Sequence, residues 1–181
     1  MKNKILKEIN IEEIMESLKK DSKKNSYLKV LWNGKNIEVD LNFEDFEKEI
    51  DEIREKLENL KILVENANEW DKKIKDAAGE DFFEIIEGDN WPKSDFEEED
   101  IPNLINDIEK YIGKEEADNL RNGNFTREAF KNLLYVSSIT MDNNDCFNVG
   151  LFDIDYIMFG GHILFIDGNI NGEFYGGDMA G

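Results

Sequence analysis

The sequence predicts an α+β fold in which an antiparallel sheet of about six strands packs against a helical hairpin or against long helices. Three observations predict this fold. An Asn33-Gly34 turn joins two segments of alternating apolar and polar residues, and the last fifty residues alternate β-rich runs with polar turns. Between these regions, apolar residues recur at heptad spacing. The sheet is therefore expected to combine an N-terminal hairpin with a C-terminal meander.

The first predicted element is a short helix over residues 10–24. Asn10 can cap this helix, and Glu13 stands at the capping-box position. Apolar residues at three- and four-residue spacing form one face of the segment, and lysines gather at its C-terminal end, where the helix dipole favours cations.

A β-hairpin is predicted next, over residues 26–41. Apolar residues alternate with polar ones on both sides of Asn33-Gly34. This dipeptide between two alternating segments is a strong short-range signal for a two-residue hairpin turn.

The long helical region is predicted to begin at Asn42. Its apolar residues are spaced alternately by three and four, which forms a seam of about three and a half heptads. The seam consists of Phe43, Phe46, Ile50, Ile53, Leu57, Leu60, Val64 and Ala67. We expect it to pack on the sheet of the same domain, with a dimeric coiled coil as the alternative. The spacing slips near Asn66, where a break would give two helices.

The remaining elements follow from turn signals and apolar spacing. A helix should end near Gly88, and an exposed acidic loop should follow at residues 94–100. The later segments are two helices and four strands, predicted at 101–112, 126–133, 135–141, 146–152, 162–166 and 173–175.

Length and composition limit the class of protein. The chain has 181 residues and a formal charge of −20, which fits one domain with an appendage. We predict an N-terminal helical extension at 1–25 and a single domain at 26–181, with a helical and acidic insertion at about 95–122. No apolar run is long enough for a membrane helix. A single cysteine, Cys146, favours a cytoplasmic location.

The distribution of charge predicts what the protein binds. Residues 80–100 carry ten acids and one lysine, and residues 132–181 carry seven acids and no lysine or arginine. Such a surface repels nucleic acid and anionic lipid, which leaves a basic protein partner or no partner, and a protein partner is expected. The leading hypothesis is a non-enzymatic interaction module, and an immunity-type protein is one form of it. The expected contacts are Asp95, Glu97, Glu98, Glu99 and Asp100.

The alternative hypothesis is a small-ligand or metal-binding domain in the C-terminal tail. His162, the one histidine, could lie near Asp153, Asp155 and Asp178 in a meander. A histidine with carboxylates can ligate a metal or act as a general base. The two hypotheses are separated by whether these four side chains converge.

A calcium loop is a further candidate, at residues 167–178. Asp167, Asn169, Asn171 and Asp178 occupy positions 1, 3, 5 and 12 of such a loop, with Gly172 at the turn. Position 12 is Asp rather than Glu, and the flanking segments resemble strands rather than helices. Asp-Gly and Asn-Gly are also common hairpin turns, so a hairpin is the expected structure and no cofactor is expected, with calcium as the alternative.

One set of sequence features is shared with a known family. The features are Trp32-Asn33-Gly34, the helices at 43–78, Asn90-Trp91, Thr126 with Phe130, Phe159 to Ile166, and Ala180-Gly181. Together they resemble an uncharacterised bacterial domain family of unknown function. The resemblance covers about 26–181 and implies a cytoplasmic bacterial protein of unassigned activity, similar to proteins encoded near toxin or immunity genes. A second glycine before His162 departs from the aromatic-Gly-His of the family.

Overall fold

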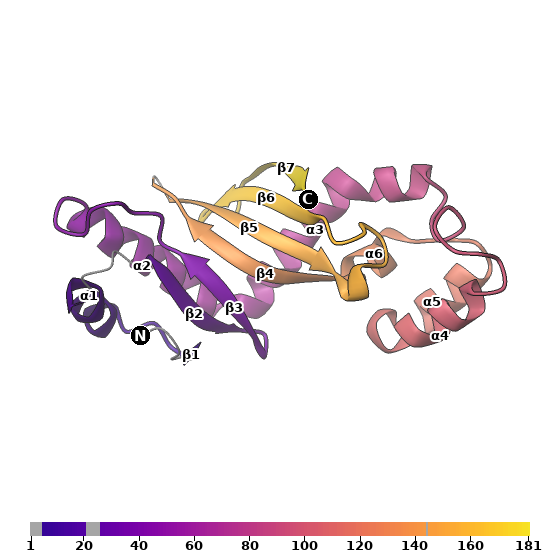
Figure 1. Ribbon diagram of the computed structural model, residues 1–181, viewed down its shortest axis with the longest axis horizontal. Helices are drawn as coiled ribbons and strands as arrows, with labels where there is room; N and C mark the ends of the chain where they lie inside the picture. The colour runs from indigo at the N-terminus through magenta and orange to yellow at the C-terminus, as the bar shows by residue number, and fades with distance from the viewer. Residues whose placement is uncertain (1–4, 21–25, 144) are drawn as a thin grey trace.

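A computed structural model describes residues 5–20, 26–143 and 145–181, and Figure 1 shows its arrangement. The described residues form one sheet, with α2 and α3 behind it in this view and α4 and α5 beyond one end of it. In chain order the elements are β1 (Ile5–Leu6), α1 (Ile11–Lys20), β2 (Tyr27–Trp32), β3 (Lys35–Asp40), α2 (Ile50–Glu65), α3 (Ala67–Gly88), α4 (Ile101–Ile112), α5 (Lys114–Arg121), α6 (Arg127–Leu133), β4 (Leu134–Met141), β5 (Cys146–Asp153), the 3₁₀ turn η1 (Ile154–Tyr156), β6 (Ile163–Asn169) and β7 (Phe174–Ala180).

The α+β class is confirmed, but the expected antiparallel sheet of six strands is wrong in two respects. The described sheet has seven strands, in the order β1 to β7, and it is mixed. The pairs β1–β2 and β3–β4 are parallel, and the other four pairs are antiparallel. Both parallel pairs are joined through helices, which return the chain to the end of the sheet where the previous strand began.

The N-terminal hairpin is confirmed. Tyr27 pairs with Asp40 and Trp32 with Lys35, so two residues connect β2 to β3. Asn33 and Gly34 have φ values of 45° and 80°. Positive φ at both central residues is what a type I′ turn requires, and it matches the twist of the flanking strands.

The helical region begins later than predicted. Asn42 has a left-handed φ of 46°, and residues 43–49 form turns in which the Glu49 carboxylate accepts the N–H of Asp45 at 2.7 Å. The break near Asn66 is confirmed by the boundary between α2 and α3. Figure 1 shows α2 behind β2 and β3, and α3 behind the later strands.

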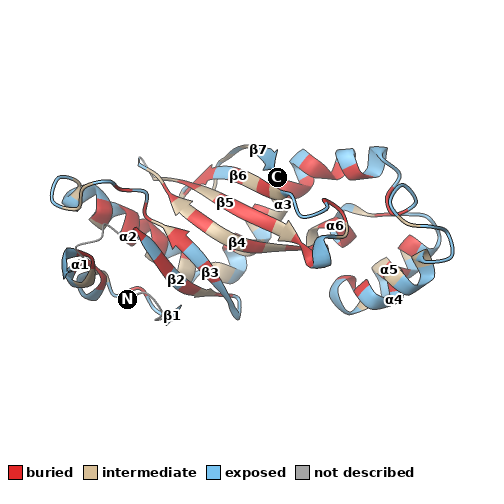
Figure 2. Cartoon of the chain, viewed as in Figure 1, coloured by how far each residue is buried: buried red, intermediate tan, exposed pale blue. Residues whose placement is uncertain are grey.

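The heptad seam packs inside the chain. Ile53, Leu57 and Leu60 have no exposed surface and belong to the hydrophobic core. Ile50 is 42% exposed, so this position of the predicted seam does not reach the core, whereas Phe43, in the turns before α2, does. Figure 2 shows buried residues along both α2 and α3. Burial of this stripe against the sheet accounts for the spacing without a coiled coil.

The N-terminal helix is confirmed for the described residues 11–20. Asn10 Oδ1 accepts the N–H of Glu13 at 3.3 Å. Three apolar side chains of α1, namely Ile14, Met15 and Leu18, join the same core as the sheet. Residues 21–25, the rest of the predicted helix, lie outside the described residues.

The second half follows the prediction except for α5. Gly113, with a φ of 84°, ends α4, and the unpredicted helix α5 follows at once. Thr126 caps α6 by accepting the N–H of Ala129 at 3.0 Å. The four tail strands occur where expected, and β6 and β7 are longer than predicted. Among the residues that the structure describes, no helix combines the length and apolar character needed to cross a bilayer.

Candidate functional site

The acidic segment lies at one end of the molecule, on the second half of α3 and the loop that leads to α4. Asp95, Glu97, Glu98, Glu99 and Asp100 are all exposed on this loop. The other five acids of the segment, on α3 and directly after it, are also exposed: Glu80, Asp81, Glu84, Glu87 and Asp89. Within the described part of the chain, none of these ten side chains forms an ion pair or a side-chain hydrogen bond.

An apolar base supports this acidic end. Trp91 packs on Phe125 with ring centroids 4.7 Å apart, and Phe83 contacts both Phe125 and Phe130. Trp91 is 4% exposed, and its Nε1–H donates to the backbone oxygen of Ile157 at 3.1 Å. The acidic residues are therefore held on a rigid apolar support, although their own charges repel one another.

A pocket opens beside the acidic loop. Its walls come from the residues that precede the loop, from Ile101 directly after it, and from the α5–α6 connection. The lining residues are Asn90, Trp91, Pro92, Lys93, Ile101, Leu120, Arg121, Asn122 and Gly123. Arg121 is committed to Glu109 and Asp118, at 2.7 and 2.8 Å. The pocket is thus a partly apolar depression that also carries the exposed Lys93, next to a strongly negative surface.

The structure does not bring the His162 group together. Asp153 is fully buried at the end of β5, on the side of the sheet that faces the helices. Asp178 pairs with Phe165 of β6, which alternates with the buried Leu164, and so it lies on the opposite side. Asp155 is exposed in η1. Across the described ranges, no three His, Cys, Asp or Glu side chains are placed to hold a metal ion.

His162 lies against the last residue of the chain. A Cβ added to Gly181 would overlap the imidazole ring, so the contact depends on glycine at this position. The imidazole is exposed, and the backbone N–H of His162 donates to Phe159 at 3.0 Å. Among the described residues, no hydrogen bond or ion pair joins the imidazole to Asp153, Asp155 or Asp178.

Asp153 instead organises the loop after β5. Its Oδ2 accepts the N–H of Met158 at 2.8 Å, whereas Oδ1 has no hydrogen-bond partner among the described residues. Burial raises the pKa of Asp153, and the backbone N–H groups that it accepts partly oppose this rise. The Asp153 carboxylate therefore stabilises the loop that carries Ile157, whose backbone oxygen accepts the hydrogen bond from Trp91.

The calcium-loop residues belong to the hairpin between β6 and β7. Asn169 Oδ1 accepts the N–H groups of Asn171 and Glu173, at 3.0 and 3.2 Å. Asp167 Oδ1 accepts from Asn148 Nδ2 at 2.8 Å. The oxygen of Asn169 is thus used to close the turn, and Asp178 lies further along β7 as a strand residue.

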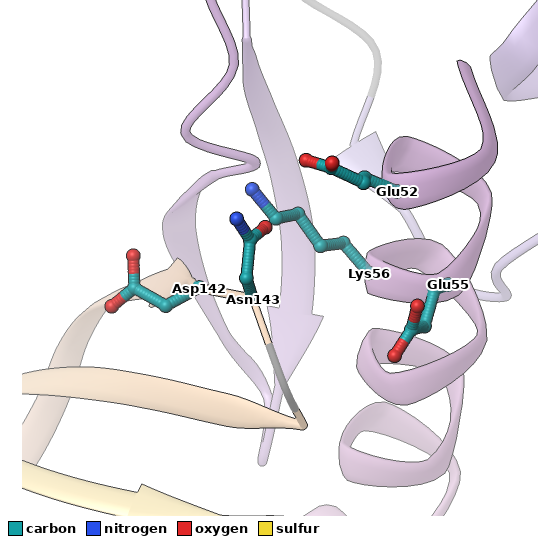
Figure 3. Close-up of a pocket in the computed structure, with 5 residues that line it drawn as sticks. All are labelled: Glu52, Glu55, Lys56, Asp142 and Asn143. Carbon is teal, nitrogen blue, oxygen red and sulfur yellow. The ribbon is translucent and has the colours of Figure 1, made fainter. Parts of the chain in front are cut away.

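A second pocket, shown in Figure 3, lies between α2 and the turn after β4. It is lined by Glu52, Glu55, Lys56, Asp142 and Asn143. Lys56 is 3% exposed, and its ammonium group donates to the backbone oxygen of Asn42 at 2.9 Å. In Figure 3 the Lys56 side chain reaches toward Asn143, whereas the Asp142 carboxylate points away from the helix.

This Lys56 pocket is part of a polar network that the sequence did not reveal. Asn42 Nδ2 donates to Asp142 at 2.7 Å, and Asn59 Nδ2 donates to Asp145 at 3.0 Å. The network ties the left-handed Asn42 and the β4–β5 turn to α2. The only signal in the sequence is that Lys56 and Asn59 share the helix face of Ile53 and Leu60.

Comparison with known proteins gives a family. A model of a family described as uncharacterised proteins conserved in bacteria, DUF2262, matches residues 12–179, from the first turn of α1 to β7. No curated protein and no solved structure matches the chain. The expected resemblance to an uncharacterised bacterial family is confirmed.

Proposed function

The chain belongs to the DUF2262 family, and we propose that it is a non-enzymatic module that binds a basic protein at its acidic end. The description of the family names no activity. The observation that carries the proposal is the set of ten exposed acids at residues 80–100 that have no partner among the described residues. An immunity-type role, in which the partner is a basic toxin encoded nearby, is the specific form that we favour. The lone Cys146 fits an encounter in the cytoplasm.

Electrostatics supports this choice of partner. A concentrated negative surface steers a basic protein and raises its association rate by about 10- to 1000-fold at low salt. The acids also contribute little to the stability of the fold, because an exposed carboxylate without an ion-pair partner makes no stabilising contact. The pocket beside the loop supplies the apolar contact that charge alone cannot, since buried contacts near the centre of an interface carry most of its binding energy.

The test is co-purification with the products of adjacent genes. The binding variant carries Asp95→Asn, Glu97→Gln, Glu98→Gln, Glu99→Gln and Asp100→Asn. A matched control neutralises five acids elsewhere, with the same change of net charge: Glu12→Gln, Glu16→Gln, Glu38→Gln, Glu65→Gln and Glu69→Gln.

We expect a basic neighbour to co-purify with the wild type and the control but to be lost from the binding variant. Equal binding by both variants would show that only total charge matters. If no basic product of an adjacent gene binds the wild type, the immunity-type role is wrong.

A further inference from the structure

The two edges of the sheet differ in how they are protected. At one edge β1 has two residues, and a short edge strand offers little backbone for another chain to pair with. At the other edge β7 has seven residues and a single neighbour, β6. Outside its ladder with β6, β7 forms no backbone hydrogen bond with any other described residue.

The sequence of β7 has only part of the usual protection of an edge strand. Edge strands are commonly guarded by lysine or proline, and β7 has neither; it has one charged residue, Asp178, and a register shift opposite Asp167 and Gly168. Gly176 and Gly177 leave the middle of the strand without side chains. The N–H of Met179 donates to Asp178 Oδ1 at 2.8 Å, which indicates that this N–H is directed away from β6.

The surroundings of this edge are mainly negative, and Lys73, which lies next to Gly172 in the turn before β7, is paired with Glu69. A Cβ on Gly177 would overlap the Phe82 ring, so α3 crosses directly behind the strand. Phe82 is flanked along α3 by Glu80, Asp81 and Glu84, three exposed acids of the acidic end. Residues 132–181, which include β6 and β7, contain no lysine or arginine. The free edge and the acidic end are thus adjacent.

We propose that the outer edge of β7 takes an extended, lysine- or arginine-rich segment of a protein partner as an eighth strand. Strand addition supplies affinity through main-chain hydrogen bonds, and alternate side chains of the added strand supply specificity. The basic side chains on one side of that strand face the acids of α3. A second copy of this chain fits poorly, because it would bring two negative edges together. The inference rests on the proposed function for the basic character of the partner.

The experiment uses a labelled peptide of alternating lysine and valine and measures binding by fluorescence anisotropy. The comparison peptides replace lysine with glutamate or place a proline at the centre. The key variant is Met179→Pro, which removes an outward N–H without removing a donor to β6, and Met179→Ala is its matched control. We expect the wild type and Met179→Ala to bind the lysine peptide, and Met179→Pro to bind it about tenfold or more weakly.

Hydrogen exchange on the wild-type protein provides a readout that does not depend on how Met179→Pro folds. The lysine peptide should slow exchange at the outward amides of β7, including that of Met179. Exchange that slows only at residues 95–100 would overturn the strand-addition proposal and leave the proposed function intact. Unchanged peptide binding by a folded Met179→Pro variant would overturn the proposal as well. A wild-type dimer that Met179→Pro abolishes would also overturn it, because a second copy of the chain would then occupy the edge of β7.

Discussion

The two halves of α3 differ sharply in how their charges are used. In the first half, Lys73 pairs with Glu69 at 2.7 Å and Lys75 with Asp71 at 2.9 Å. In the second half, Glu80, Asp81, Glu84 and Glu87 are exposed, without a partner among the described residues. Charges that stabilise a helix occur as pairs four residues apart, whereas unpaired like charges destabilise it. The second half therefore retains a surface that the fold does not need.

What holds the acidic end is apolar packing. Trp91, Phe83, Phe125 and Phe130 form a continuous group of aromatic contacts beneath it. Phe130 also contacts Phe159 of the loop after β5, with ring centroids 6.1 Å apart. Burial of such side chains is worth more than the repulsion of exposed carboxylates, which solvent screens.

Removing this aromatic support should have the largest effect on the free energy of unfolding. Phe130 has no exposed surface, so Phe130→Ala should lower the free energy of unfolding by about 3–5 kcal/mol, because it leaves a cavity among the aromatic rings. Urea unfolding followed by circular dichroism measures this change. Ile85→Ala, at a 48% exposed position on the same half of α3, should change stability by less than about 0.5 kcal/mol. Equal effects would show that the acidic end is not anchored through Phe130.

Loss of the Asp153 carboxylate should have the next largest effect. Asp153→Ala leaves the N–H of Met158 without its acceptor and should cost about 1–3 kcal/mol, measured by urea unfolding. The acidic end should loosen too, because the same loop accepts the hydrogen bond of Trp91. A variant as stable as the wild type would show that the loop holds its shape without this carboxylate.

The effect of pH on Asp153 has a definite sign. Because burial raises its pKa, the folded state holds the proton more tightly than the unfolded state does. Its contribution to stability is fully present below the ordinary pKa of an aspartate and is lost as pH rises through the raised value. Unfolding of the wild type and Asp153→Asn across that range should show the wild type gaining relative stability as pH falls. The opposite trend would contradict a raised pKa.

The elements that the sequence predicted correctly depend on neighbours in the chain. Asn33-Gly34 determines its turn through its own backbone, Thr126 caps α6 through a residue three positions away, and the break at Asn66 follows from a change in apolar spacing. The parallel pairing of β3 with β4 could not be predicted in this way. It depends on where more than ninety residues of helix and loop return the chain to the sheet.

The candidate sites show the same limit. Residue type suggested that Asp153 and Asp178 could share a ligand, but they lie on opposite sides of the sheet. Lys56 looks like an ordinary surface lysine in the sequence, yet it is buried by the turn after β4, far along the chain. The exposure of Asp95 and of Glu97 to Asp100 was predicted, because a run of charges cannot be buried at low cost, and only Phe96 within this run packs against the core.

Removing a paired charge should have a smaller effect on the free energy of unfolding. The Lys131 ammonium group contacts both Asp76 and Glu128 at 2.7 Å, and its side chain is 18% exposed. These hydrogen bonds raise the pKa of Lys131, so the stabilisation is present at neutral pH and is lost only as pH rises through that pKa. Lys131→Met should cost about 1 kcal/mol in urea unfolding, whereas Lys20→Met, in an exposed pair, should cost about 0.3 kcal/mol or less.

The smallest expected effect has the opposite sign. Neutralising Asp95, Glu97, Glu98, Glu99 and Asp100 together should raise the free energy of unfolding by a few tenths of a kcal/mol at low salt, because it removes repulsion without removing a partner. Asp100 precedes α4 without a side-chain capping hydrogen bond, so its replacement by asparagine removes no such bond. The gain should disappear near 1 M salt, where charges are screened beyond about 3 Å. Neutralising the five acids of the matched control should not raise stability, because several of them form ion pairs. A loss of stability in the loop variant would mean that these carboxylates are part of the fold, and the contrast between the two halves of α3 would then not extend to the loop.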